Sequence, residues 1–353
     1  MADLPQEVTT PFSATPWSNL GDGTRARRYR HIVLALGTAL LAYLLYSVGS
    51  APILQSFRAL SWRLLIVILF PAMVLKVFDV FAWRCALPRH QVGFGPLLTA
   101  LLAGQAVTSI TPTGPFGGDA TKVWMLRHHV GQRDGVASLI IVETTSTVSQ
   151  GLFLLLGILV AQRTLLNSTP LLRAMEWVLA LEAVGVGCFV ALQCGGLAAR
   201  GHAILARFGF AGGSERGAAA AYVDDALVSF YRREPRRLQR SVAWGFLGWI
   251  VGAAEVWLIL DLLGTPVPMG TAFVIESFGT GISFATFFLP VQIGVDEGGA
   301  VATFVALGLS GAAGLSLSLV RRVREMTWIA IGLLLLMGMP PQPVKLAVQP
   351  PAA

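Results

Sequence analysis

Four charged residues lie close together in an otherwise apolar segment near the end of the chain. The segment SLSLVRRVREMTWIAIGLLLLMG, residues 316–338, contains Arg321, Arg322, Arg324 and Glu325. Arginine binds carboxylates and phosphates through a planar guanidinium group that donates parallel hydrogen bonds. Three arginines that faced lipid at mid-membrane would cost about 8 to 10 kcal/mol, so they must face protein or water. They are therefore candidates for binding an anionic group.

Acidic side chains compete for these arginines. Glu325 can reach Arg321 or Arg322 through helical spacing, so it neutralises one of them within the helix. The candidate partners outside this helix are Glu143, which is the natural one, and Glu255 and Glu276. Two interpretations stay open: the remaining positive charge binds an anionic headgroup, or the ion pairs are structural.

Two Gly- and Pro-rich segments, TPTGPFGGD and FLPVQIGVDEGG, interrupt the apolar pattern. The first precedes about twelve helical residues that cover roughly 18 Å, too little to cross about 30 Å of hydrocarbon. Irregular backbone at that depth is tolerated only inside protein or beside a wet cavity. We therefore expect the two segments to be gate loops, with the gate residues Pro112, Gly117, Gly118, Pro290, Gly294 and Gly298.

Charged residues open both short helices that follow these loops. Asp119 and Lys122 open the first, and Asp296 and Glu297 open the second. Acidic residues at helix starts also fit simple capping, which stays open for Asp119 and Asp296. The predicted substrate-binding residues are Arg321, Arg322, Arg324 and Lys122. The predicted coupling or counter-charge residues are Glu143, Glu297, Asp119, Asp296, Glu325 and Glu276.

The elements that must position these residues are membrane helices. Hydrophobic residues make up 54% of the 353 residues and charged residues 13%, a composition that excludes an ordinary soluble protein. Basic residues lie beside the apolar segments, so the net charge of +7 reflects membrane orientation rather than nucleic-acid binding. The three cysteines lack metal-ligand spacing, and we expect no metal and no cofactor. The apolar windows are 31–50, 63–83, 135–161, 172–193, 241–263 and 312–339.

The predicted fold is an all-α polytopic membrane protein with about six full spans plus two re-entrant or discontinuous helical hairpins in an inverted repeat. Arginines before the first span place the N-terminus in the cytoplasm. The predicted divisions are a disordered tail at 1–24, a first repeat at 25–193, a basic cytoplasmic linker at 194–240 with an amphipathic helix, a second repeat at 241–340 and a disordered tail at 341–353.

Three stretches together resemble a known family. TPTGPFGGDATKVWMLRHHVG, the later IIVET, and FFLPVQIGVDEGGAVATFVALGLSGAAGLSLSLVRRVRE are similar to the lysylphosphatidylglycerol synthase transmembrane region, a flippase-like membrane family. The second long stretch most resembles its hopanoid-biosynthesis-associated branch. The resemblance covers roughly residues 30 to 340 and implies a multi-pass protein of the bacterial inner membrane that translocates lipid. Thr144 departs from the family, in which many members place an arginine after the glutamate that corresponds to Glu143.

We therefore expect a lipid translocase that moves an anionic or amphipathic lipid, such as a hopanoid or a lipid-linked precursor, between leaflets. The alternative is a membrane-embedded lipid-modifying transferase or a scaffold subunit of hopanoid biosynthesis. The chain has no DxD pair, which favours the transporter, and we expect no aminoacyl transfer from these residues. The expected partners are a membrane lipid substrate, anionic lipids at the RREPRR cluster of the linker and lipid-biosynthesis enzymes, with no nucleic acid.

Overall fold

Helices account for all the regular structure in the described part of the chain. The computed structural model describes residues 50–87, 92–111, 115–164, 169–207, 214–285 and 295–338. These ranges contain eleven helices and no strand: α2 (Ser50–Ala86), α3 (Phe94–Ile110), α4 (Pro115–Leu126), α5 (Gln132–Thr164), α6 (Thr169–Cys194), α7 (Leu197–Arg207), α8 (Ser214–Arg233), α9 (Pro235–Leu262), α10 (Met269–Ala285), α11 (Val295–Ala306) and α12 (Gly311–Gly338). The two predicted tails, and all but the last residue of the predicted span at 31–50, lie outside them.

Three of the described helices are long and apolar enough to cross a membrane, namely α5, α6 and α9. The 28 residues of α12 also exceed the length needed, but the helix carries the four charges described above. The 37 residues of α2 contain Pro71, which removes one backbone donor from the helix interior. The structure confirms the all-helical class with membrane-spanning helices. The number of spans and the inverted repeat remain predictions.

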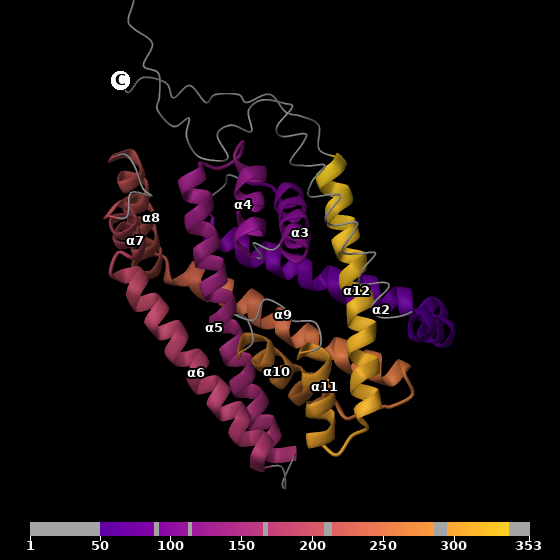
Figure 1. Ribbon diagram of the computed structural model, residues 1–353. Helices are drawn as coiled ribbons and strands as arrows, with labels where there is room; N and C mark the ends of the chain where they lie inside the picture. The colour runs from indigo at the N-terminus through magenta and orange to yellow at the C-terminus, as the bar shows by residue number, and fades with distance from the viewer. Residues whose placement is uncertain are drawn as a thin grey trace, which may run out of the picture.

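Two short helical hairpins flank the middle of the molecule. α3 has 17 residues and α4 has 12, and α10 and α11 repeat the same two lengths. Each pair packs together, and Figure 1 shows the α3–α4 hairpin at one end of the molecule and the α10–α11 hairpin at the other. The predicted short helices after the two loops are therefore confirmed.

Close approach between α3 and α4 depends on small residues. A Cβ atom at Gly118 of α4 would lie 1.9 Å from the Thr108 hydroxyl oxygen and 2.5 Å from the Gly104 carbonyl oxygen of α3. Gly117 and Gly118 therefore lie in a helix, not in a loop as the sequence suggested, and Gly118 forms the close contact with α3. Pro115 occupies the first position of α4, where its missing N–H costs nothing, so the helix begins before the two glycines.

The linker after α6 contains two helices. α8 confirms the predicted helix from Ser214, whereas α7 was not expected from the sequence. The Asp224 carboxylate of α8 accepts hydrogen bonds from the backbone N–H groups of Ala198 and Ala199, at 3.0 and 2.8 Å, in the first turn of α7. This contact satisfies donors that a helix start leaves free and holds the two helices together.

Candidate functional site

The three arginines of α12 each contact a glutamate on a different neighbouring helix. The pairs are Arg321 with Glu276 of α10 at 2.5 Å, Arg322 with Glu297 of α11 at 2.9 Å, and Arg324 with Glu255 of α9. Glu255 and Glu276 are buried, with 1% and 6% of their surface exposed. A buried carboxylate is tolerated when it is paired and hydrogen-bonded, and these contacts supply the pairing.

Helical spacing predicts the ion pairs that lie within one helix. Glu325 contacts Arg322 at 3.1 Å, which confirms one of the two options for this glutamate. Lys76 and Asp79 of α2 lie 3.6 Å apart.

The carboxylate of Glu143 on α5 contacts Lys122 of α4 at 3.8 Å, and Lys122 also contacts Asp119 at 2.9 Å. The expected pairing of Glu143 with an arginine of α12 is therefore wrong for the described contacts. The reason lies in the packing, because α5 contacts α4, α9 and α10, while α12 contacts α2, α3, α9 and α11. The Glu143 carboxylate of α5 therefore lies beside Lys122 of α4 rather than beside an arginine of α12.

The cluster around α12 does not carry the surplus positive charge that the helix alone suggested. We call the three arginines and their four glutamate partners the arginine cluster, which consists of Arg321, Arg322, Arg324, Glu255, Glu276, Glu297 and Glu325. Formally, acids exceed bases by one, because three of the glutamates come from helices other than α12. An anionic ligand at this cluster would have to displace one of those carboxylates.

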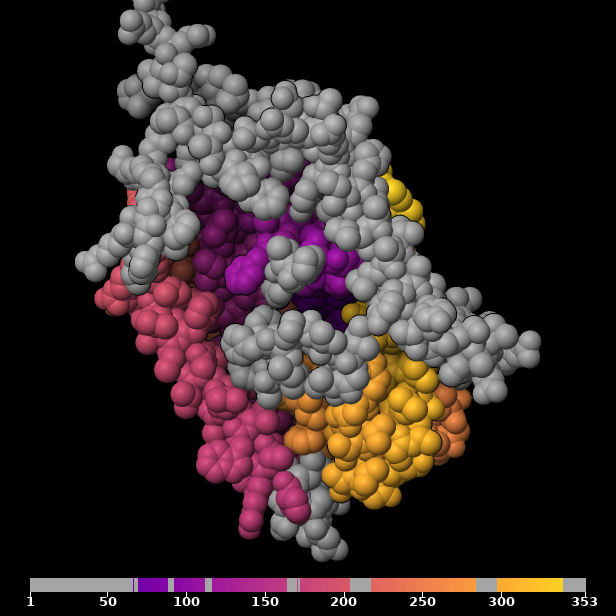
Figure 2. Space-filling view, viewed as in Figure 1, coloured from indigo at the N-terminus to yellow at the C-terminus, as the bar shows by residue number. Residues whose placement is uncertain are grey.

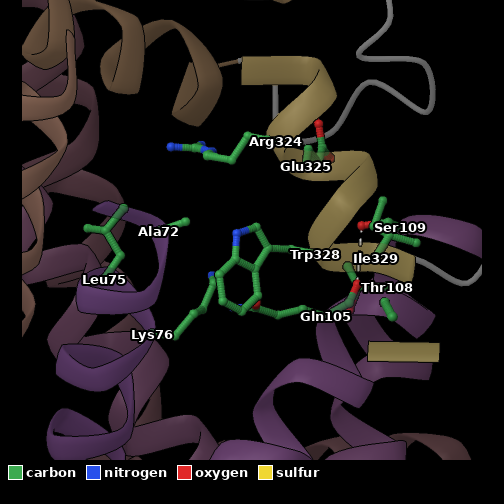
Figure 3. A pocket seen from close by; sticks show the side chains of 11 residues that line it. Ala72, Leu75, Lys76, Gln105, Thr108, Ser109, Arg324, Glu325, Trp328 and Ile329 are labelled. Carbon is green, nitrogen blue, oxygen red and sulfur yellow. Dashed lines mark hydrogen bonds between the residues drawn. The ribbon is translucent and has the colours of Figure 1, made fainter. Parts of the chain in front are cut away.

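A cavity of about 330 Å³ lies next to the cluster, between α2, α3 and α12. Its polar lining comprises Lys76, Gln105, Thr108, Ser109, Arg324, Glu325 and Trp328, and its apolar lining comprises Ala72, Leu75, Ala106 and Ile329. Figure 3 shows the Trp328 indole projecting between the side chains of Lys76 and Arg324. Its volume falls in the range of small-molecule sites.

The lining supplies donors, acceptors and both signs of charge. The Thr108 and Ser109 hydroxyls each donate at 3.1 Å to a carbonyl of their own helix, from Gly104 and Gln105, so their oxygen lone pairs face outward as acceptors. Lys76 and Arg324 bring two cationic groups, and Trp328 brings a flat amphipathic surface. Such a lining suits a polar headgroup that carries a phosphate and further polar groups.

The predicted site residues take different places. All four predicted binding residues are held in the ion pairs above, and of the four only Arg324 also lines the cavity. Gly298 lies within α11, again a helix rather than a loop. For Asp296 the structure describes only the α11 backbone, and Pro112, Pro290 and Gly294 lie outside the described residues.

Sequence reasoning missed several lining residues. Helical spacing in the sequence predicts a pair between Lys76 and Asp79 but gives Lys76 no place in a cavity, and Trp328 was not singled out. The polar run Gln105, Thr108 and Ser109 at the end of an apolar helix was the signal, since a polar helix end inside a membrane needs a partner.

These helices, hairpins and intramembrane charges define an integral membrane protein with a cavity among its helices that polar and apolar side chains line together. The chain matches the family described as the lysylphosphatidylglycerol synthase TM region over residues 31–342, and it belongs to that family. The resemblance seen in the sequence is thereby confirmed, and the family points to a lipid-related function in the membrane. The family description names no hopanoid branch, so that assignment remains a prediction. Neither the curated proteins nor the solved structures compared with the chain give a match.

Proposed function

We propose that the protein is a lipid translocase of the bacterial inner membrane that moves an anionic or amphipathic lipid, such as a hopanoid or a lipid-linked precursor, between leaflets. The observation that carries the proposal is the cavity between α2, α3 and α12, which has polar and charged side chains in its lining and lies among helices of a lipid-related membrane family. A headgroup held there would be shielded from hydrocarbon while the tail stays in the lipid. This removes the main cost of crossing the bilayer.

The packing of the helices supports a repeat of two similar halves. If α2 to α5 are laid onto α9 to α12 in order, the observed contacts exchange consistently: α3 packs on α12 as α10 packs on α5, α2 packs on α5 as α9 packs on α12, and α2 packs directly on α9. The equal lengths of the two hairpins agree with this correspondence. Two halves so arranged can rock against each other about the α2–α9 contact, as in transporters with alternating access.

The arginine cluster lies within the second half. Its ion pairs tie α12 to α9, α10 and α11, all in that half. The cavity lies between α12 and the helices α2 and α3 of the first half. Movement of the first half against α12 would open or close the cavity without breaking these ion pairs. We therefore assign the cluster to holding the second half rigid, and we assign Arg324, which pairs with Glu255 and also lines the cavity, a second role in contact with the headgroup.

The basic linker is proposed to bind anionic lipid at the cytoplasmic surface. Arg232, Arg233 and Arg236 are exposed or half-buried around the junction of α8 and α9, and each basic residue near such a surface contributes about 1 kcal/mol. Binding there would hold the N-terminus of α9 at the headgroup level. Docking of lipid-biosynthesis enzymes at the same face is a further proposal.

Reconstitution into liposomes tests the translocase. Vesicles would contain a fluorescent phosphatidylglycerol or phosphatidylcholine, and an impermeant reductant would bleach only the outer leaflet. We expect wild type to expose inner-leaflet probe, and Lys76→Gln and Trp328→Leu to slow this exposure. Arg163→Gln, at an exposed arginine of α5 outside the cavity, is the matched control. If the cavity variants move every lipid as fast as this control does, the cavity is not the headgroup site.

A further inference from the structure

Glu182 is a buried carboxylate that lacks a hydrogen-bond partner. It lies near the middle of the 26 residues of α6, roughly 18 to 20 Å from either end of that helix. Only 1% of its surface is exposed, and neither carboxylate oxygen accepts a hydrogen bond. Its side chain packs against Gly151 of α5, where an added Cβ would lie 3.6 Å from the carboxyl carbon.

The charged groups on the helices that pack against α6 are used elsewhere. On α5, Glu143 contacts Lys122, and on α10 the only charged residue, Glu276, contacts Arg321. Of the remaining charged groups with described side chains, Asp134 accepts a hydrogen bond from Tyr222, Asp224 caps α7, and His202 is half-buried. The others are exposed, namely Arg133, Arg163, Arg173, Glu176, Arg200, Asp225, Arg232 and Arg233. None of these forms an ion pair with Glu182.

An ionised carboxylate in this setting would carry a large uncompensated desolvation cost. A bound cation would remove that cost. A metal ion needs several oxygen ligands, and no group of three or more His, Cys, Asp or Glu side chains gathers anywhere in the described residues. A proton needs only the one carboxylate. The proton is therefore the ligand that fits the site.

Release of that proton requires movement of α6. The contact with α5 shields the carboxyl from solvent, while most of α6 faces outward, with only 11% of its apolar window buried. Figure 2 shows α6 along one flank of the molecule, away from α11 and α12 on the other. A separation of α6 from α5 would expose Glu182 and leave the arginine cluster intact.

We propose that Glu182 is the proton-binding residue that couples lipid movement to a pH gradient, an inference that rests on the proposed translocase. The carboxylate takes one proton from water on one side of the membrane, is occluded against Gly151, and returns the same proton to water on the other side. Only an O–H bond forms and breaks. Glu143 and Glu297 are less suited to this exchange, because each has a cationic partner.

The first test does not require transport. A hydrophobic carbodiimide modifies protonated carboxyl groups inside membranes, so full-length protein in vesicles would be treated at several pH values and analysed by peptide mass spectrometry. We expect modification of Glu182 that declines as pH rises, and none at that position in Glu182→Gln. An unmodified Glu182 at every pH would overturn the proposal, even if no lipid proves to be transported.

The second test uses lipid movement under an imposed pH gradient. We expect the gradient to change the rate in wild type and in Glu176→Gln, an exposed glutamate on the same helix, and to have no effect in Glu182→Gln. Glu182→Asp keeps an acid with a shorter side chain and should retain the response if the glutamine variant folds poorly. A gradient response in Glu182→Gln equal to that of wild type would exclude the coupling role. Lipid movement in no variant, including wild type, would instead refute the translocase.

Discussion

Each arginine inside α12 is tolerated because it forms an ion pair with a carboxylate from another helix. Arg324 and Glu255 form the most buried of these pairs, with 22% and 1% of their side chains exposed. A pair of this kind adds little net stability over apolar residues of the same size, but the loss of one member leaves an isolated buried charge. The pair therefore makes the structure depend on both residues.

We expect Arg324→Ala to lower the free energy of unfolding by about 3 to 5 kcal/mol, because Glu255 loses its counter-charge. Thermal or denaturant unfolding in detergent measures this change. The exposed Arg233→Ala in α8 should stay within about 0.5 kcal/mol of wild type. Adding Glu255→Leu to an Arg324→Met variant should restore most of the loss, and a double variant no more stable than Arg324→Ala would contradict the pairing.

Sequence reasoning reached the pairs that helical spacing sets, and for the pairs between helices it gave only a set of candidates, of which Glu255 and Glu276 are confirmed and Glu143 is not. Arg322 with Glu325 and Lys76 with Asp79 lie three residues apart, so the helix alone brings them together. Glu255 was identified only as one of several candidates, because no local rule says which helices cross. Glu182 carried no signal beyond being one acid in an apolar helix.

At the scale of elements, the tightest feature is the packing of α4 on α3. The presence and the length of about twelve residues of a short helix followed from the sequence, but its start did not, because the sequence interpretation began the helix at Asp119 and α4 begins at Pro115. The close approach was not predicted either, because a pair of glycines is compatible with a loop and with a helix contact. The sequence interpretation chose the loop, and the structure shows the contact.

Gly118→Ala should destabilise the hairpin by about 1 to 3 kcal/mol or more, because the added methyl group meets the backbone carbonyl of Gly104 as well as the Thr108 side chain. A thermal shift in detergent measures the loss. Gly95→Ala in the first turn of α3 is the matched control, since nothing lies within 4 Å of a Cβ there. That control should be neutral or slightly stabilising. Equal melting temperatures for the two variants would show that the helices do not approach this closely.

The stability that the contact between α8 and α5 contributes should be lost at alkaline pH. The Tyr222 hydroxyl donates to the Asp134 carboxylate at 2.7 Å, and this hydrogen bond raises the pKa of Tyr222 above its usual value near 10. Because the pKa is higher in the folded state, the contact stabilises at pH values below 10 and is lost as pH rises through the folded-state pKa. Tyr222→Phe should cost about 0.5 to 1.5 kcal/mol at pH 7 and nothing at strongly alkaline pH. Unfolding at both pH values checks this, and a constant difference would disprove it.

At the scale of the whole molecule, the decisive feature is how the two halves face the membrane. The exchange of packing partners between α2–α5 and α9–α12 indicates two similar units, but packing alone is the same for parallel and inverted repeats. The odd number of crossings that we predict between the hairpins, made by α5, α6 and α9, distinguishes them. With three crossings, the two hairpins open from opposite sides.

Single cysteines at the starts of the two short helices test this orientation. Gly118 of α4 is a poor position for a cysteine, because a side chain there would disrupt the α3–α4 contact. Phe116 of α4 and Gly298 of α11 are exposed and therefore suit accessibility measurements. In a background that lacks the native Cys85, Cys188 and Cys194, an impermeant thiol reagent added to intact cells should modify one of Phe116→Cys and Gly298→Cys. The other should react only after the membrane is opened. An even number of crossings would put both cysteines on the same side of the membrane. Equal protection or equal reaction of the two cysteines in intact cells would therefore rule out the inverted repeat. It would also rule out the rocking motion proposed for lipid transfer, because that motion depends on the inverted repeat.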